Sequence, residues 1–274
     1  MSLEEQLVQL CRRQLESGQP AVLGLNGPVG AGKTTLSRHV QQTCAAAGLH
    51  LAVASIDDAY LPWAQRLQAM EGNPFGVTRV PPGSHDPALL HDCIERWRSR
   101  ADRQLELPRF DKTLRQGEGD RCGSWQGTAD ALLLEGWLVG CRPYSSVQAE
   151  AALGELAELS DAERRWALHC NQALGPYQAL WDQLDQLVQL WPIRWELPRR
   201  WRFQAEARQR RCGGGWLPGN ALQRLVDASL KSLPPSLYQQ PLLARANWVR
   251  LLDARRRCVW EGSGEAALSR LAQP

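Results

Sequence analysis

The chain has 274 residues, of which 43% are hydrophobic and 22% are charged, and its formal net charge is +3. This length and composition predict a single domain over residues 1–274, and the small positive excess gives no ground for a nucleic-acid partner. No stretch approaches the ~20 consecutive apolar residues of a membrane span, so we expect no membrane partner. Eight scattered cysteines without a Cys-x-x-Cys pair argue against a zinc ribbon and favour the reducing cytoplasm.

The chain starts with an amphipathic pattern at about residues 2–17, which predicts a helix and contains no apolar signal-peptide region. A short apolar run at 21–25 predicts a buried strand, and residues 34–47 carry an uninterrupted helical pattern. The P-loop pattern Gly27-x-x-x-x-Gly32-Lys33-Thr34 lies between them.

Such a turn directs backbone N–H groups at a polyphosphate bound at a helix N-terminus. Lys33 is expected to reach the β/γ-phosphates of ATP, and the Thr34 hydroxyl to bind Mg²⁺. An ordinary glycine-rich turn is the alternative. The predicted nucleotide-binding residues of the turn are Gly27, Pro28, Val29, Gly30, Ala31, Gly32, Lys33, Thr34 and Thr35.

A second apolar run at 49–56 predicts a buried strand that ends at Asp57 and Asp58. Ligands of doubly wound sheets bind at the carboxyl ends of the strands, so both carboxylates are expected beside the phosphates. Asp57 would accept the proton of an attacking hydroxyl group. Asp58 suits either the substrate site or the N-cap of a helix starting near residue 61.

Two polar segments follow. Residues 71–86 form a long Gly/Pro-rich loop that contains Arg79 and His85, and Asp86-Pro87 then predicts the start of a helix. His85 fits substrate binding and local hydrogen bonding equally well. Residues 107–121 read as a charged loop whose cations, among them Arg109, Lys112 and Arg121, serve either a solvated face or an anionic substrate.

An apolar strand at 131–136 ends with Glu135, which is expected to hold Mg²⁺ opposite Thr34, or else to pair with Lys33. Residues 146–190 have a helical pattern that closes on a fourth strand at 187–190, and 248–253 predict the last strand. Between these, residues 194–211 contain seven arginines. They predict a lid over the phosphates at about 194–216, with Arg202 and Arg210 as the contacts and Gly213–Gly215 as the hinge; a nucleic-acid patch is the alternative.

Several of these segments together resemble the plant- and cyanobacterial-type D-glycerate 3-kinases, which are P-loop kinases related to phosphoribulokinase, uridine kinase and pantothenate kinase. The matching segments are Gly27–Leu36, Ser55–Tyr60, Gly83–Asp86, Leu107–Thr113 with Gly119–Arg121, Leu134–Trp137, and Trp201–Glu206 with Arg210. The resemblance implies that Asp57 is the base and that Tyr60 belongs to the substrate site. Ala59 departs from the aromatic residue common at its position.

The sequence therefore predicts an α/β, three-layer P-loop fold with a mainly parallel five-stranded sheet and an Arg-bearing lid. The resemblance implies that the γ-phosphoryl group of Mg-ATP is transferred to the 3-hydroxyl of D-glycerate, with Lys33, Asp57 and Arg202 as the catalytic residues. The alternatives are another small acceptor such as a nucleoside, pantothenate or a sugar phosphate, a nucleotide-dependent switch without an acceptor, and an RNA-binding protein. The oligomeric state is left open.

Overall fold

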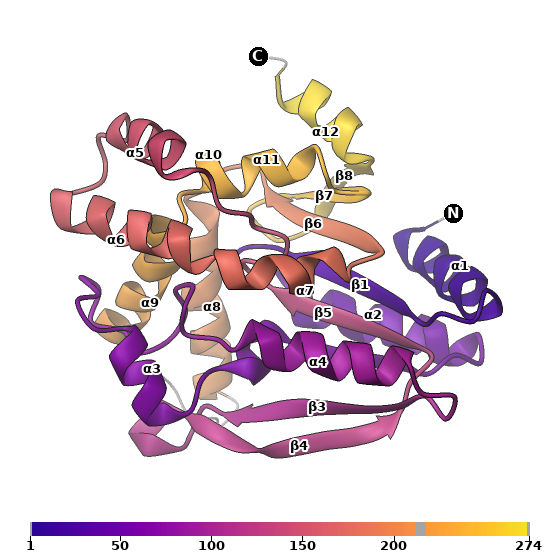
Figure 1. Ribbon diagram of the computed structural model, residues 1–274. Coiled ribbons are helices and arrows are strands. Elements are labelled where there is room, and N and C mark those ends of the chain that lie inside the picture. The colour runs from indigo at the N-terminus through magenta and orange to yellow at the C-terminus, as the bar shows by residue number, and fades with distance from the viewer. Residues whose placement is uncertain (1, 212–217, 273–274) are drawn as a thin grey trace.

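A computed structural model describes residues 2–211 and 218–272 of the chain. Its centre is a six-stranded sheet with the order β2-β5-β1-β6-β7-β8, and helices cover both faces (Figure 1). Five strands pair in parallel, and only β8 pairs antiparallel, with β7. The strand bounds are β1 Ala21–Asn26, β2 Leu51–Ser55, β5 Ala131–Gly136, β6 Gln186–Pro192, β7 Trp248–Leu252 and β8 Cys258–Gly262.

The three layers follow from the alternation of side chains along the buried strands. In β1, Leu23 and Leu25 pack in one cluster with α1 (Leu3–Glu16) and α2 (Lys33–Ala46), whereas Val22 belongs to the cluster on the opposite face. The first cluster also contains Trp201 of the predicted lid. The predicted three-layer P-loop fold is therefore confirmed.

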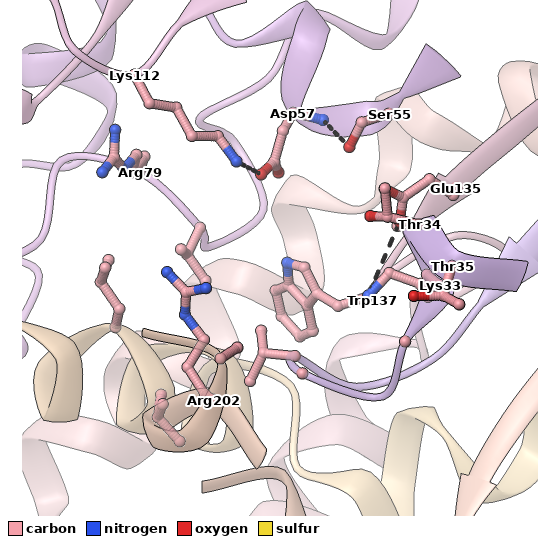
Figure 2. A pocket seen from close by; sticks show the side chains of 18 of the residues that line it. Lys33, Thr34, Thr35, Ser55, Asp57, Arg79, Lys112, Glu135, Trp137 and Arg202 are labelled. Atoms are coloured by element: carbon pink, nitrogen blue, oxygen red, sulfur yellow. Dashed lines mark hydrogen bonds and ion pairs between the residues drawn. The ribbon is translucent and has the colours of Figure 1, made fainter. Parts of the chain in front are cut away.

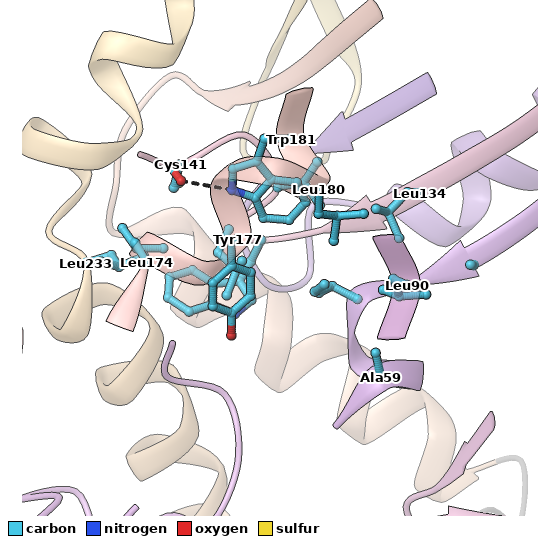
Figure 3. Packing of buried hydrophobic residues seen from close by; sticks show 14 of the residues in the cluster. Ala59, Leu90, Leu134, Cys141, Leu174, Tyr177, Leu180, Trp181 and Leu233 are labelled. Atoms are coloured by element: carbon cyan, nitrogen blue, oxygen red, sulfur yellow. Dashed lines mark hydrogen bonds between the residues drawn. The ribbon is translucent and has the colours of Figure 1, made fainter. Parts of the chain in front are cut away.

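The second cluster lies between the sheet and α4 (Pro87–Arg98), α6 (Asp161–Ala173) and α7 (Gln178–Asp182). Figure 3 shows part of it, with Leu90 and Leu134 on one side and Tyr177 and Trp181 on the other. The Trp181 indole N–H donates to the backbone oxygen of Cys141 at 3.0 Å. This packing fixes α4, whose N-cap Asp86 accepts a hydrogen bond from the N–H of Leu89, as the Asp-Pro pair predicted.

The structure differs from the sequence prediction at two places. All five predicted strands are present and parallel, but β8 adds a sixth strand that the sequence pattern did not reveal. Residues 107–121, predicted as a loop, lie largely in a separate antiparallel hairpin of β3 (Gln104–Asp111) and β4 (Asp120–Thr128). The sequences of β4 and β8 lack the apolar alternation that marks a buried strand, because β4 is mostly exposed and β8 lies at the edge of the sheet.

The buried Arg66 holds the tip of this hairpin against the body of the domain. Its guanidinium donates to the backbone oxygens of Glu118 at 3.0 Å and Gly119 at 2.6 Å, and also to that of Leu61 at 2.9 Å. Arg66 lies on α3 (Trp63–Ala69), so the hairpin is fixed relative to the end of β2. This anchor decides where the cations of the hairpin lie.

The other helices connect or cover these elements. Gly213–Gly215, the predicted hinge of the lid, lie outside the described residues. Within the described ranges, no helix is long and apolar enough to span a bilayer. The remaining bounds are η1 Ile56–Ala59, η2 Arg115–Gly117, α5 Ser146–Gly154, η3 Gly175–Tyr177, α8 Leu197–Arg211, α9 Gly219–Ser232, α10 Pro235–Tyr238, α11 Gln240–Leu243 and α12 Gly264–Leu271.

Candidate active site

The turn between β1 and α2 has the backbone conformation of a P-loop. Gly30 and Gly32 have φ angles of +77° and +95°, in the left-handed region that side chains disfavour. Gly32 is also the N-cap of α2, so the first amide groups of this helix lie at the turn without intrahelical acceptors. The turn therefore forms a helix N-terminus suited to a phosphate group.

Lys33 and Glu135 lie close together at this turn. The Lys33 ammonium donates to the backbone oxygen of Gly27 at 2.9 Å and lies 3.9 Å from a carboxylate oxygen of Glu135. Burial lowers the pKa of Lys33, and the charges of Glu135 and Asp57 oppose this change. Burial likewise raises the pKa of Glu135, against the effect of Lys33. The phosphate-binding lysine and the expected metal-binding carboxylate thus share one partly buried location.

The P-loop opens into a cavity of about 410 Å³, whose wall comes from segments far apart in the sequence (Figure 2). Gly27, Pro28 and Ala31 contribute to the loop but not to the cavity wall. The predicted residues that line the cavity are Val29, Gly30, Gly32, Lys33, Thr34, Thr35, Asp57, Tyr60, Arg79, Lys112, Glu135 and Arg202. The structure therefore brings together the lysine-bearing turn and the two strand ends that carry carboxylates.

Asp57 lies on η1, directly after β2, between the P-loop and the cations of the hairpin. Its carboxylate accepts a hydrogen bond from the Lys112 ammonium at 2.6 Å and lies 3.7 Å from Nε2 of His85. Burial alone would raise the pKa of Asp57, but Lys112 and His85 outweigh this effect and hold the pKa well below its usual value. Asp57 is therefore ionised at neutral pH, which is the form that can accept a proton.

His85 is buried next to Tyr60 and Asp57, two residues of the cavity wall. Its Nδ1 hydrogen-bonds with the Tyr177 hydroxyl at 2.9 Å, and its ring stacks on Tyr60 with the ring centroids 4.3 Å apart. Burial lowers the pKa of His85, although Asp57 opposes the change. Because His85 is buried and does not line the cavity, its position fits local hydrogen bonding better than direct substrate binding.

Two of the predicted substrate residues form an ion pair outside the cavity. A carboxylate oxygen of Asp58 accepts from the backbone N–H of Ser55 at 3.0 Å and lies 3.5 Å from the guanidinium of Arg109. Asp58 thereby caps η1 together with Ser55, and not the following α3. Arg109 lies on β3 and, like Asp58, does not line the cavity, so substrate contact by these two residues stays a prediction.

Arg121 and Arg210 also differ from their predicted roles. Arg121 donates to the backbone oxygen of Tyr60 at 2.8 Å and to the carboxylate of Asp86 at 3.0 Å, and so ties β4 to η1 and α4. Arg210 is exposed on α8 and does not line the cavity, whereas Arg208 does. Since consecutive helical residues are rotated by about 100°, two residues two positions apart point in nearly opposite directions.

The base of the lid helix packs directly on the P-loop. Trp201 is fully buried, and its indole N–H donates to the backbone oxygen of Ala254 at 3.0 Å. A Cβ atom on Gly30 would lie 2.7 Å from the backbone nitrogen of Arg202, so only glycine allows this approach. The Arg202 side chain points into the cavity in Figure 2 and forms an ion pair with Glu206 at 3.0 Å.

The cavity wall also contains residues that the sequence did not indicate as site residues, among them the polar or charged Trp137, Arg208 and Arg256. Trp137 follows the Glu135 strand end directly, and Arg208 belongs to the predicted arginine run, so both had a sequence signal. Arg256 had none, because it lies in the turn between β7 and β8. Burial and the neighbouring charge of Arg208 lower the pKa of Arg256, which shows that two cations approach each other here.

Comparisons with known proteins indicate the class of protein to which this fold is similar. No family model matches the chain. The solved D-glycerate 3-kinase of Cryptococcus neoformans var. grubii is 26% identical, with a TM-score of 0.80 over 96% of this chain and 99% of that chain. A fission-yeast protein, the uncharacterized kinase mug58 of Schizosaccharomyces pombe, is 29% identical over 69% of this chain and 71% of its own length.

The chloroplastic D-glycerate 3-kinase of Arabidopsis thaliana is 27% identical over 81% of this chain, which spans about half (49%) of that relative. The fold, the P-loop and these relatives together define the protein as an ATP-dependent kinase of the P-loop class. Within that class the chain is similar to the D-glycerate 3-kinases, over most of its length.

Proposed function

We propose that the protein transfers the γ-phosphoryl group of ATP to the 3-hydroxyl of D-glycerate, giving 3-phosphoglycerate. Two similar proteins, one of them matched over 96% of this chain, carry the name D-glycerate 3-kinase. The observation that carries the proposal is the position of Asp57, an ionised carboxylate between the P-loop and a cationic part of the wall formed by Arg79 and Lys112. With the P-loop on one side of Asp57 and the cations on the other, the cavity suits a phosphate donor at the first side and an acidic acceptor at the second.

The nucleotide end would bind the phosphates through the P-loop amides and Lys33. Arg202 extends from the lid into the same cavity and would neutralise charge on the transferred group. Lys33 is hydrogen-bonded to P-loop carbonyls in this structure, so it would exchange them for phosphate oxygens when the nucleotide binds.

Thr34 and Glu135 would hold Mg²⁺ at this end. Both side chains line the cavity, and both provide oxygen, the ligand atom that Mg²⁺ prefers. No cluster of three or more His, Cys, Asp or Glu side chains suited to a metal occurs in the parts of the chain described. A two-residue protein contribution fits Mg²⁺, which usually keeps several waters and binds substrate phosphates. The ion would neutralise the charge of the phosphates.

Asp57 would orient the 3-hydroxyl and accept its proton. A carboxylate with a lowered pKa is a weak base, but phosphoryl transfer proceeds through a loose transition state in which positioning and charge stabilisation provide most of the catalysis. The proton is therefore taken up late, when the hydroxyl oxygen has already begun to bond to phosphorus. Asp57 does not need an elevated pKa for this role.

The acceptor is tested with a coupled assay of ADP release. D-glycerate, L-glycerate, uridine, pantothenate and ribulose 5-phosphate are compared at matched concentrations, and the phosphorylated product is identified by mass. We expect D-glycerate to give the highest kcat/KM and the product to be 3-phosphoglycerate. Higher kcat/KM with any other acceptor would reject the substrate assignment, and ATP binding without turnover of any acceptor would favour a nucleotide-dependent switch.

We further propose that residues 1–274 act as one kinase domain and that the protein works in the reducing cytoplasm. The second point is supported by the cysteines: all seven that the structure describes are free thiols, two of them exposed. Localisation of the tagged protein by microscopy or fractionation tests it, and recovery from an oxidising compartment would contradict it.

A further inference from the structure

Arg79 is a buried cation without an ionic partner among the residues that the structure describes. Its side chain is mostly buried, with the residue 9% exposed, and one of its terminal nitrogens donates to the backbone oxygen of Glu118 at 3.2 Å. The two arginines of the hairpin strands differ, since Arg109 pairs with Asp58 and Arg121 with Asp86. Arg66, which donates to the same backbone oxygen of Glu118, is satisfied by three backbone oxygens and does not line the cavity. Removing a guanidinium from water without a counter-charge costs stability, so such an arginine is usually completed by an anion.

The position of Arg79 indicates where this anion would come from. Arg79 lines the cavity beside Lys112, on the side away from Lys33 and Thr34, and Asp57 lies between the two groups (Figure 2). A molecule whose hydroxyl group lies at Asp57 and points toward the P-loop would therefore extend its other end toward Arg79. An anionic group at the far end of the acceptor would therefore lie beside Arg79 and provide its counter-charge.

Lys112 is placed to join Arg79 at this end. It forms a 2.6 Å hydrogen bond with Asp57, but its own side chain is 56% exposed. An ion pair of such an exposed lysine contributes little net stability, so it exchanges partners readily. Moving from Asp57 to an incoming anion would free a carboxylate oxygen of Asp57 for the acceptor hydroxyl.

A buried polar atom of the cavity wall also lacks a hydrogen-bond partner among the described residues. It is the indole nitrogen of Trp137. Buried polar atoms are nearly always hydrogen-bonded in native proteins, so an unpartnered one beside a cavity indicates a polar ligand. This observation agrees with an oxygen-rich acceptor in the cavity.

We propose that Arg79 and Lys112 form the carboxylate subsite of the acceptor and make the enzyme specific for small hydroxy acids over neutral polyols. Arg79 provides the fixed, buried cation, and Lys112 the exposed one that leaves Asp57 when substrate binds. This inference rests on the proposed function, because it assigns a binding site to the carboxylate end of the acceptor, which does not react.

The experiment compares Arg79→Gln with Arg109→Gln, a matched substitution in an arginine outside the cavity. We expect Arg79→Gln to raise the KM for D-glycerate about 100-fold, as expected for a lost charge-assisted hydrogen bond pair, with the KM for ATP within about twofold of the wild type. Arg109→Gln should leave both KM values within about twofold. Arg79→Lys keeps the charge and should recover part of the loss, and Lys112→Met should raise the KM about tenfold.

Glycerol serves as the neutral acceptor, because it keeps both hydroxyl groups of glycerate and has a CH2OH group in place of the carboxylate. The preference of the wild type for D-glycerate over glycerol, measured as the ratio of kcat/KM values, should fall by about 100-fold in Arg79→Gln. A residue with a merely structural role would lower both activities together and leave this ratio unchanged. An unchanged ratio therefore overturns the proposal.

Other outcomes separate this proposal from the proposed function. A wild type that phosphorylates a different acidic acceptor, with a KM that depends on Arg79, supports the subsite and rejects D-glycerate. A wild type active only on neutral acceptors overturns both. Should Arg79→Gln lose the ATP-induced rise in Tm, and thus be misfolded, Lys112→Met decides: an unchanged KM for D-glycerate in that variant overturns the proposal.

Discussion

The two ends of the cavity are built in different ways. The proposed nucleotide end consists of one continuous turn, whose backbone amides and two glycines with positive φ suit a phosphate group. The acceptor end consists of side chains from separate segments: Asp57 after β2, Arg79 in a loop, and Lys112 beyond the end of β3. A local backbone motif suits a ligand common to many enzymes, whereas dispersed side chains can change one at a time and so set the acceptor.

The largest expected effect is at Asp57, where the two ends meet. Asp57→Asn keeps the size of the side chain but cannot accept a proton, and we expect kcat to fall about 1,000-fold. The P-loop is untouched, so the rise in Tm on adding ATP should stay as in the wild type. Near-normal turnover would show that Asp57 is not the base and that catalysis does not depend on its position between the two ends of the cavity.

The nucleotide end is tested by Gly30→Ala. A Cβ atom there would meet the lid backbone at 2.7 Å and would add strain at a φ of +77°, so we expect kcat/KM to fall about 100-fold through displaced phosphates. Gly48→Ala is the control, because Gly48 also has a φ of +77° but no atom within 4 Å of the added Cβ. Both substitutions should lower Tm, and equal losses of activity would contradict the role of the lid contact.

Arg256→Gln is expected to have a smaller effect, confined to the nucleotide end. Arg256 lines the cavity near Arg208, and the loss of one charge-assisted contact to phosphate should raise the KM for ATP about tenfold. The KM for D-glycerate should not change. The neighbouring Arg255 is exposed and does not line the cavity, so Arg255→Gln should behave as the wild type. If Arg256→Gln changes the KM for D-glycerate but not the KM for ATP, Arg256 acts at the acceptor end of the cavity.

The smallest effect is a change in pH dependence at the acceptor end. Lys112 stabilises the ionised form of Asp57, so Lys112→Met should raise the pKa of Asp57. Protonated Asp57 cannot act as a base, and the acid limb of kcat/KM should therefore move to higher pH in the variant. The kcat/KM profile reports the free enzyme, in which Lys112 is bound to Asp57. If the acid limb of kcat/KM stays at the same pH in the variant, Lys112 does not control the ionisation of Asp57.

The sequence predicted the P-loop turn and the five parallel strands because both depend on local signals. A P-loop is contiguous, and the buried parallel strands are short apolar runs that end in polar residues, as Asp57 and Glu135 show. The acceptor end was predicted only as a set of candidate cations. Neither Arg79 nor Arg109 lies in a contiguous motif that assigns its role. The anchoring of the hairpin by Arg66 decides where Arg109 and Lys112 lie relative to the cavity.

The same limit explains Arg256 and β8. The turn at 253–257 lies beside Trp201 of the lid only because β8 returns antiparallel along the sheet edge, a long-range pairing that no local pattern encodes. The exposed residues of β8 carry no apolar alternation, so the strand itself was not predicted.

That turn also affects how the protein matures during synthesis. The P-loop and most of the sheet leave the ribosome early, but the backbone oxygen of Ala254 that holds Trp201 is translated 53 residues after Trp201, and Arg256 follows it. A nascent chain lacking the β7–β8 turn keeps the packing of that helix on Gly30 but lacks the hydrogen bond that holds the Trp201 indole. Docking of the lid helix should therefore be complete only after this late segment has emerged from the exit tunnel.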